Sequence, residues 1–235
     1  MQMARSVRDA IPEIHREGWP FVAVALAFAV LFAFVFPPLF WLLLILAGWV
    51  AVFFRDPVRV VPTSPGLVVS PADGRIEPIV RAAPPPELEL GPEPLTRISV
   101  FMNVFDCHIN RAPVAGRVVR VAYKAGKFLS ADLDKASEAN ERNSLIIEAA
   151  DGARIGVVQI AGLVARRILC WTSRGAEVAT GERIGMIRFG SRLDVYLPAG
   201  SVVVAGAGQR AIAGETLIAL LPGAEYRPPS AMRRD

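Results

Sequence analysis

The hexapeptide PADGRI at residues 71–76 returns as PVAGRV at residues 113–118, an offset of 42 residues. A second pair matches the decapeptide GAEVATGERI at 175–184 to GQRAIAGETL at 208–217, an offset of 33 residues. In both pairs, glycines stand where tight turns are needed, and alternating residues can face one core. Because two ordered pairs recur, we predict a duplicated domain with a pseudo-twofold axis and a cleft between its halves.

The sequence around these repeats consists of short β-branched runs separated by glycine and proline. Examples are LVVS at 67–70, TRISVFM at 96–102, GRVVRVAY at 116–123 and RIGVVQIA at 154–161. Runs of four to eight such residues with turn signals between them are typical of strands. We therefore predict a mainly β fold, and the repeated hairpin pattern resembles the barrel-sandwich-hybrid domains of the lipoyl and biotinyl type.

A different pattern precedes the β-rich part. Residues 19–54 contain no charged side chain, and Pro37-Pro38 divides this stretch into two apolar pieces. Because 36 helical residues exceed one bilayer crossing and proline interrupts a helix, we predict a helical hairpin that bends at the prolines. Arg16 before the stretch and Arg55 after it place both ends in the cytoplasm. Residues 1–54 are thus expected to anchor the chain to the cell membrane from the cytoplasmic side, and residues 55–235 to form the second domain. The hairpin either crosses twice or dips in and returns; a buried hairpin in a soluble core is the alternative.

Composition adds three limits. The mean hydropathy of +0.40 is high for a wholly soluble domain, and the excess lies mainly in residues 19–54. Cys107 and Cys170 have no CxxC or Cys/His spacing, so we predict no metal site. The net charge of +4 fits an anionic membrane surface or phosphate groups, and we expect no nucleic-acid partner.

Two segments of the β-rich part are predicted to be loops. We interpret residues 124–144 as a long loop that serves as a lid or binding element, and residues 84–94 as a connector.

Five short motifs occur in order along the β-rich part: SPADG at 70–74, HINRAP at 108–113, NERN at 140–143, QIAGLVARR at 159–167 and FGS at 189–191. Each motif is weak by itself, but their order resembles the short form of the phosphatidylserine decarboxylase family over roughly residues 55–222. His108 is the single histidine of this region, and His15 lies before the hairpin.

The resemblance implies that the chain cleaves itself after Gly190, giving fragments 1–190 and 191–235 that stay associated. Ser191 would become a pyruvoyl group, the cofactor for converting phosphatidylserine to phosphatidylethanolamine. A serine hydroxyl needs a neighbouring base, and the family assigns that role to a histidine backed by an aspartate, here His108 and Asp73. His108 could also protonate the carbanion that decarboxylation leaves. The expected partners are the phospholipid substrate, the membrane and, as one expected assembly, a second copy in a homodimer.

One position departs from the longer relatives, which carry a second histidine where Arg111 stands here. His108 either serves both self-cleavage and decarboxylation, or Arg111 takes part by holding the substrate carboxylate or phosphate. Asn110 and Arg166 are further candidates for substrate contact.

Two other functions stay open at this point. A non-catalytic, membrane-tethered binding module on a lipoyl-like scaffold is one, although a carrier domain would show a lysine at a hairpin tip and none is present. A decarboxylase of a related serine-headgroup lipid is the other, because the reacting end of that substrate would be the same.

Overall fold

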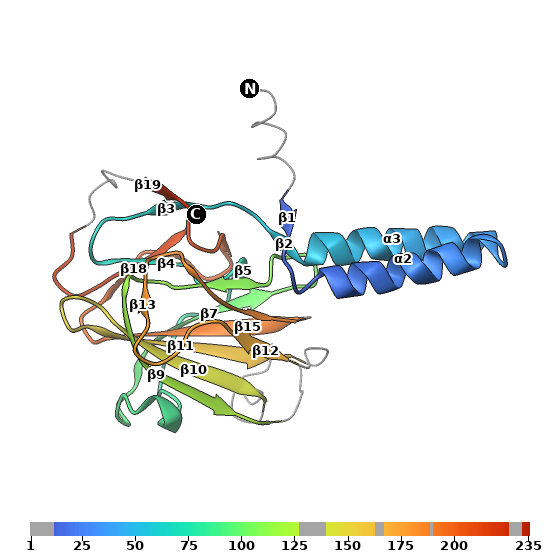
Figure 1. The fold of residues 1–235 in the computed structure, drawn as a ribbon. Coiled ribbons are helices and arrows are strands. Elements are labelled where there is room, and N and C mark those ends of the chain that lie inside the picture. The colour runs from blue at the N-terminus through green and yellow to red at the C-terminus, as the bar shows by residue number, and fades with distance from the viewer. Residues whose placement is uncertain (1–11, 127–139, 163–166, 189, 226–231) are drawn as a thin grey trace. The chain divides into compact units, whose positions relative to one another are not determined.

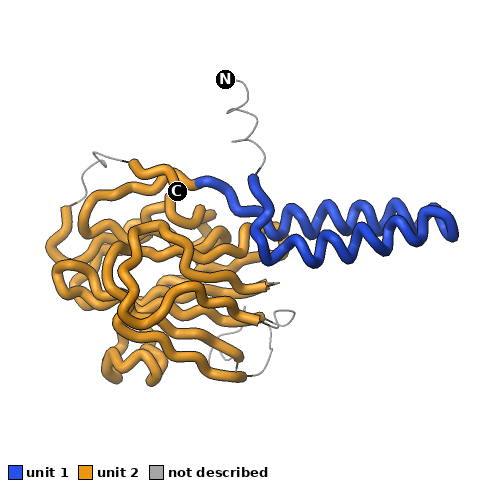
Figure 2. Tube along the Cα trace, in the orientation of Figure 1, with its two compact units in different colours: residues 1–58 blue, residues 59–235 orange. Residues whose placement is uncertain are grey.

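A computed structural model describes residues 12–126, 140–162, 167–188, 190–225 and 232–235. The chain divides into two compact units, residues 1–58 and 59–235, shown in blue and orange in Figure 2. The predicted Arg166 contact lies outside the described residues, as does most of the predicted lid.

The first unit is a helical hairpin. Helices α2 (Trp19–Ala33) and α3 (Pro37–Phe53) pack side by side, and strand β1 (Glu13–Ile14) pairs with β2 (Arg55–Asp56) at their base (Figure 1). The bend lies at residues 34–36, just before the two prolines, whereas the sequence pattern predicted it at the prolines themselves. Pro37 and Pro38 begin α3 because the missing amide hydrogen costs nothing in the first turn of a helix.

The hairpin exposes much of its apolar surface. Phe34 at the tip is 91% exposed, and Trp41 and Ile45 on α3 are also exposed. Among the described residues, neither helix is both long and apolar enough to cross a membrane.

The second unit is built from antiparallel strands, which confirms the predicted mainly β class (Figure 1). The largest sheet has nine strands: β5 (Gly74–Ile76), β6 (Val80–Ala82), β7 (Leu95–Met102), β9 (Gly116–Lys124), β10 (Arg142–Glu148), β11 (Arg154–Ala161), β13 (Glu177–Val178), β15 (Ser191–Leu197) and β17 (Arg210–Ala211). Its order is β13-β9-β10-β11-β15-β7-β5-β17, and β6 pairs with β7.

Three smaller sheets complete this unit. They are β8 (Ile109–Arg111) with β14 (Arg183–Ile187) and β12 (Ile168–Cys170); β4 (Leu67–Val69) with β18 (Leu217–Leu220) and β16 (Val202–Val203); and β3 (Val60–Pro62) with β19 (Met232–Arg234).

The predicted duplication is visible in matched backbone hydrogen bonds. Gly214 N donates to Ser70 O at 2.8 Å, and its counterpart Gly181 N donates to Ala112 O, also at 2.8 Å. The paired strands repeat in the same way, since β17 pairs with β5 as β13 pairs with β9. Each Pro-x-x-Gly hairpin therefore holds its own segment with two glycines six residues apart, Gly175 and Gly181 in one half and Gly208 and Gly214 in the other.

The two halves also bond to each other symmetrically. Val69 N donates to Pro113 O at 2.9 Å, and Arg111 N donates to Pro71 O at 2.8 Å. By the 42-residue offset, Val69 corresponds to Arg111 and Pro71 corresponds to Pro113, so the two hydrogen bonds are equivalent. The pseudo-twofold axis thus passes between the hairpins that begin at Pro71 and Pro113.

The main core lies on one face of the large sheet and a smaller core on the other. Side chains such as Val100, Leu145 and Leu193 form the main core. On the opposite face, Leu88 of the 3₁₀ helix η1 (Pro86–Leu88) packs with Tyr196. Residues 84–94 are therefore more than the predicted connector, because they cover this second apolar face.

The end of the predicted lid is also different from expectation. Strand β10 begins at Arg142, so residues 142–144 belong to the sheet rather than to a loop. Asn143 pairs there with Gln159 of β11, and burial of this pair outweighs the low strand preference of asparagine.

Candidate active site

Ser191 is the first residue of β15, at the centre of the large sheet. It lies opposite Met102 of β7 on one side and Ala161 of β11 on the other. The residue is completely buried, and its hydroxyl lies 3.9 Å from the Met102 sulfur. A thioether is a weak acceptor, so no strong hydrogen bond to this sulfur holds the hydroxyl back from reaction.

Gly190 precedes this strand with a φ of +61°, a conformation that side-chain-bearing residues rarely adopt. A Cβ on this residue would meet nothing within 4 Å, so backbone conformation rather than space favours glycine here. The Gly190 N–H donates to Nε2 of His108 at 3.3 Å. The structure therefore brings together Gly190, Ser191 and His108, as the motifs predict.

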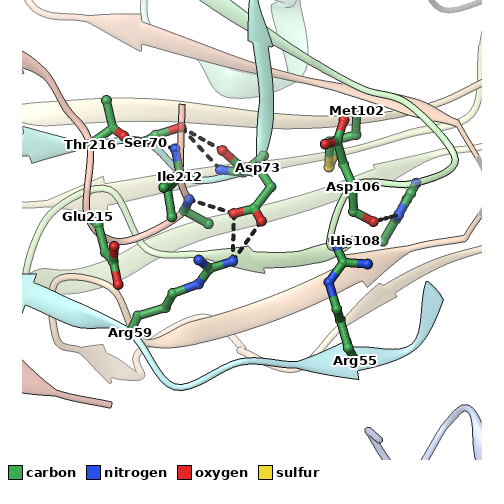
Figure 3. A network of polar contacts seen from close by, with 12 residues as sticks. Arg55, Arg59, Ser70, Asp73, Met102, Asp106, His108, Ile212, Glu215 and Thr216 are labelled. Atoms are coloured by element: carbon green, nitrogen blue, oxygen red, sulfur yellow. Dashed lines mark hydrogen bonds and ion pairs between the residues drawn. The ribbon is translucent and has the colours of Figure 1, made fainter. Parts of the chain in front are cut away.

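His108 is fully buried and has a defined tautomer. Its Nδ1 lies 2.9 Å from the backbone carbonyl of Asp106, which can only accept, so Nδ1 carries the hydrogen (Figure 3). Nε2 then carries the lone pair that receives the Gly190 N–H. An imidazole oriented in this way presents a basic nitrogen to the Gly190–Ser191 segment.

The loop before His108 is fixed by its own polar side chains. The Asp106 carboxylate accepts the backbone N–H of Asn103 at 2.9 Å and forms an ion pair with Arg210. The Asn103 side chain in turn accepts the N–H of Phe105 at 2.8 Å. The sequence reasoning missed Asp106 and Asn103, although an Asn-x-x-Asp spacing is a turn signal that could have indicated them.

Asp73 makes different contacts from those that the family resemblance implies. Both oxygens of its carboxylate accept from one guanidinium nitrogen of Arg59, at 2.7 and 2.8 Å, and Oδ1 also accepts the N–H of Ala213 at 2.8 Å (Figure 3). Within the described part of the chain, these are the contacts of its carboxylate, and His108 is oriented by Asp106 instead. The role of Asp73 behind His108 stays a prediction.

Arg111 is 1% exposed. Its guanidinium donates to the carbonyl of Gly181 at 2.8 Å and forms an ion pair with Asp235. A Cβ on Gly214 would lie 3.3 Å from Cδ of Arg111, so this side chain fills the space between the two repeated turns. Substrate contact by Arg111 stays a prediction, and these contacts give the residue a structural role.

Asn110 lies on the same strand as Arg111, and its side chain is also fully buried. Its Oδ1 accepts from Gln159 at 2.8 Å, and its Nδ2 lies 3.7 Å from the Met102 sulfur. The sequence reasoning missed Met102, because a buried methionine in an apolar strand carries no signal of a polar neighbour.

Comparison with known families gives a match over most of the chain. The family model described as phosphatidylserine decarboxylase matches residues 46–219, a range that includes His108, Gly190 and Ser191.

Proposed function

The chain belongs to the phosphatidylserine decarboxylase family and is an enzyme of that class; from this premise we propose that it processes itself. In this proposal the chain cleaves itself between Gly190 and Ser191 and carries a pyruvoyl group on residue 191. It then converts phosphatidylserine to phosphatidylethanolamine in phospholipid synthesis. The observation that supports this best is the contact of His108 Nε2 with the Gly190 N–H beside the buried Ser191.

The self-cleavage needs four changes in bonding. The Ser191 hydroxyl adds to the Gly190 carbonyl carbon, and its proton passes to His108. The carbon–nitrogen bond breaks and the Ser191 nitrogen takes a proton, which leaves an ester. Loss of the Ser191 α-proton then expels the Gly190 carboxylate, and water converts the remaining dehydroalanine to a pyruvoyl group and ammonia.

The surroundings of Ser191 fit a pyruvoyl group. The hydroxyl contacts the thioether of Met102 at 3.9 Å, so replacing it by a ketone oxygen removes only a weak interaction. His108 and Met102 are the residues that would hold the group at the start of β15. Once formed, the group supplies an electrophilic ketone and an electron sink for the decarboxylation of an amine-bearing substrate.

The sheet order supports lasting association of the two fragments. Strand β15 of the 191–235 fragment lies between β7 and β11 of the 1–190 fragment, and β17, β18 and β19 each pair with strands of the larger fragment. Separating the fragments would therefore break the main core as well as five strand pairings.

We also propose that the hairpin holds the enzyme at the cytoplasmic side of the cell membrane, where its lipid substrate lies. The exposed apolar side chains of α2 and α3 support this proposal. Deleting residues 1–54 should move the protein from the membrane fraction to the soluble fraction of a cell lysate. Continued sedimentation with membranes would contradict anchoring by the hairpin.

An intact-mass spectrum of the purified protein tests the self-processing directly. We expect two fragments divided between residues 190 and 191, and the smaller fragment should carry a pyruvoyl group at its N-terminus. Ser191→Ala should give one uncleaved chain without decarboxylase activity, and His108→Ala should slow cleavage by about 10²–10⁴-fold.

Ser144→Ala is a matched control, because Ser144 is a buried serine of the same sheet on β10, which is separated from β15 by β11. It should be cleaved at the wild-type rate. A single intact chain from active wild-type protein would refute the proposal.

A further inference from the structure

Three buried carboxamides form a chain that ends at Met102, whose sulfur the Ser191 hydroxyl also contacts. Asn143 Nδ2 donates to Gln159 Oε1 at 2.8 Å, and Gln159 Nε2 donates to Asn110 Oδ1 at 2.8 Å. Asn110 Nδ2 then faces the sulfur of Met102 at 3.7 Å. Asn110, Gln159 and Met102 have no exposed surface. Buried polar side chains are costly unless they are hydrogen-bonded, and the oxygens of Gln159 and Asn110 each accept such a bond.

The Met102 sulfur determines which way each of the three carboxamides is oriented. A thioether sulfur accepts hydrogen bonds but cannot donate one, so the nitrogen of Asn110 faces it and the oxygen faces Gln159. The same reasoning then orients Gln159 toward Asn143. Every carboxamide therefore donates toward Ser191, and each bond polarises the next in the same direction.

Gln159 holds Asn110 in place across two sheets. It lies on β11 of the large sheet, whereas Asn110 lies on β8, opposite Gly185 of β14. A Cβ on Gly185 would lie 2.8 Å from Gln159 Nε2 and 2.3 Å from the carbonyl of Leu169. The carboxamide of Gln159 therefore occupies the space that a side chain at residue 185 would need.

Two donors share one weak acceptor at the end of this chain. The Ser191 hydroxyl and Asn110 Nδ2 both lie within 4 Å of the Met102 sulfur. Among the described residues, that sulfur is the only acceptor that Asn110 Nδ2 contacts. A fully buried amide donor with only a thioether partner is available to any stronger acceptor that forms nearby.

We propose that Asn110 Nδ2 is the hydrogen-bond donor that stabilises the oxyanion of self-cleavage. This inference rests on the proposed function, because the oxyanion arises at the Gly190 carbonyl. As the Ser191 oxygen bonds to the carbonyl carbon, the π electron pair moves to the carbonyl oxygen and the hydroxyl proton leaves to His108. Asn110 Nδ2 then exchanges the sulfur for this charged oxygen, and Gln159 acts as its positioning residue.

The rate of cleavage in freshly refolded protein tests the proposal. Asn110→Asp replaces the donor by an acceptor of the same shape, and Asn110→Ala removes it. Both should slow the appearance of the 191–235 fragment by about 10²–10³-fold, the usual effect of losing one oxyanion donor.

Asn140→Asp is the matched control. Asn140 is also buried, and its Nδ2 donates to the carbonyl of Ala161 at 2.8 Å, but it is not one of the three linked carboxamides. It should lose a similar amount of stability, measured as the melting temperature, without a comparable loss of cleavage rate. Gln159→Glu should slow cleavage in the wild type and have little further effect in the Asn110→Ala background.

Hydroxylamine separates the steps, because it traps the ester as a fragment that begins with an unmodified serine. The proposal requires that the Asn110 variants give little trapped ester. Wild-type cleavage rates in both variants, or accumulation of the ester, would overturn it while leaving self-processing intact. Normal processing of Ser191→Ala would instead overturn the proposed function.

Discussion

At the scale of single residues, Gly190 combines a left-handed backbone with open space around its Cα. A residue with a side chain at φ +61° costs about 1 kcal/mol, and relaxation of that strain would turn the neighbouring carbonyl. We expect Gly190→Ala to fold, to melt a few degrees lower and to cleave itself at least tenfold more slowly.

Gly152 provides the control for this prediction. Its φ is +83° and a Cβ there also meets nothing within 4 Å, but it lies in the turn between β10 and β11. Gly152→Ala should lose similar stability and keep the wild-type rate of cleavage, measured as the fraction of the 191–235 fragment over time. Equal rates in the two variants would show that the backbone conformation of residue 190 does not matter.

The residue scale also shows what sequence reasoning can reach. Ser191 and His108 could be singled out because five motifs in order resemble a known family, whereas a Gly-Ser pair or a lone histidine by itself is a weak signal. The partner that orients His108 was not, because it is the backbone carbonyl of Asp106, and every residue has such a carbonyl. Asp73 was predicted from the family resemblance, and its carboxylate binds Arg59.

At the scale of elements, η1 is attached to the sheet by one buried ion pair. The Glu87 carboxylate accepts from Arg142 of β10, with 17% and 4% of the two side chains exposed. Burial raises the pKa of Glu87, but the hydrogen bonds from Arg142 and from its own backbone, with the charges of Arg142 and Lys124, lower it below its usual 4.5 overall. A lowered pKa means that the folded state favours the ionised carboxylate.

The stability that this pair contributes is therefore present above pH 4.5 and is lost as the pH falls through the lower pKa of the folded state. Glu87→Gln should lower the free energy of unfolding by about 1–3 kcal/mol at pH 7, and by less at pH 3. Glu148→Gln, which breaks the more exposed pair with Arg154, should change it by less than about 1 kcal/mol at either pH. Urea unfolding at both pH values measures this, and an equal loss for Glu87→Gln at pH 7 and pH 3 would contradict it.

At the scale of the whole molecule, the predictable part of the fold is the part that local patterns encode. The repeated hairpins were visible because glycine and proline mark turns, and β-branched runs mark strands. Pairing between distant segments was not visible: β3 at residue 60 pairs with β19 at residue 234, and neither short strand has a distinctive pattern. The second apolar face was missed for the same reason, since Leu88 packs on residues far along the chain.

The pairing of β3 with β19 bears on the proposed two-fragment enzyme. Asp235 follows β19 and pairs with Arg111 and Arg183, which would belong to the other fragment after cleavage. Asp235→Ala would leave the guanidinium of Arg111, whose side chain is 2% exposed, without this carboxylate. We expect a loss of about 2 kcal/mol, because Asp235 itself is partly exposed.

This loss should appear as release of the 191–235 fragment at a lower urea concentration than in the wild type. Size-exclusion chromatography of the processed enzyme at increasing urea concentration measures the release. Arg234→Ala alters an exposed side chain of the same strand and should release the fragment at the wild-type urea concentration. Because Arg111 also fills the space between the Gly181 and Gly214 turns, Asp235→Ala should lower the melting temperature of the uncleaved Ser191→Ala chain as well. Unchanged release and an unchanged melting temperature would show that β19 and its aspartate do not join the fragments, and that the strand pairings of β15, β17 and β18 suffice.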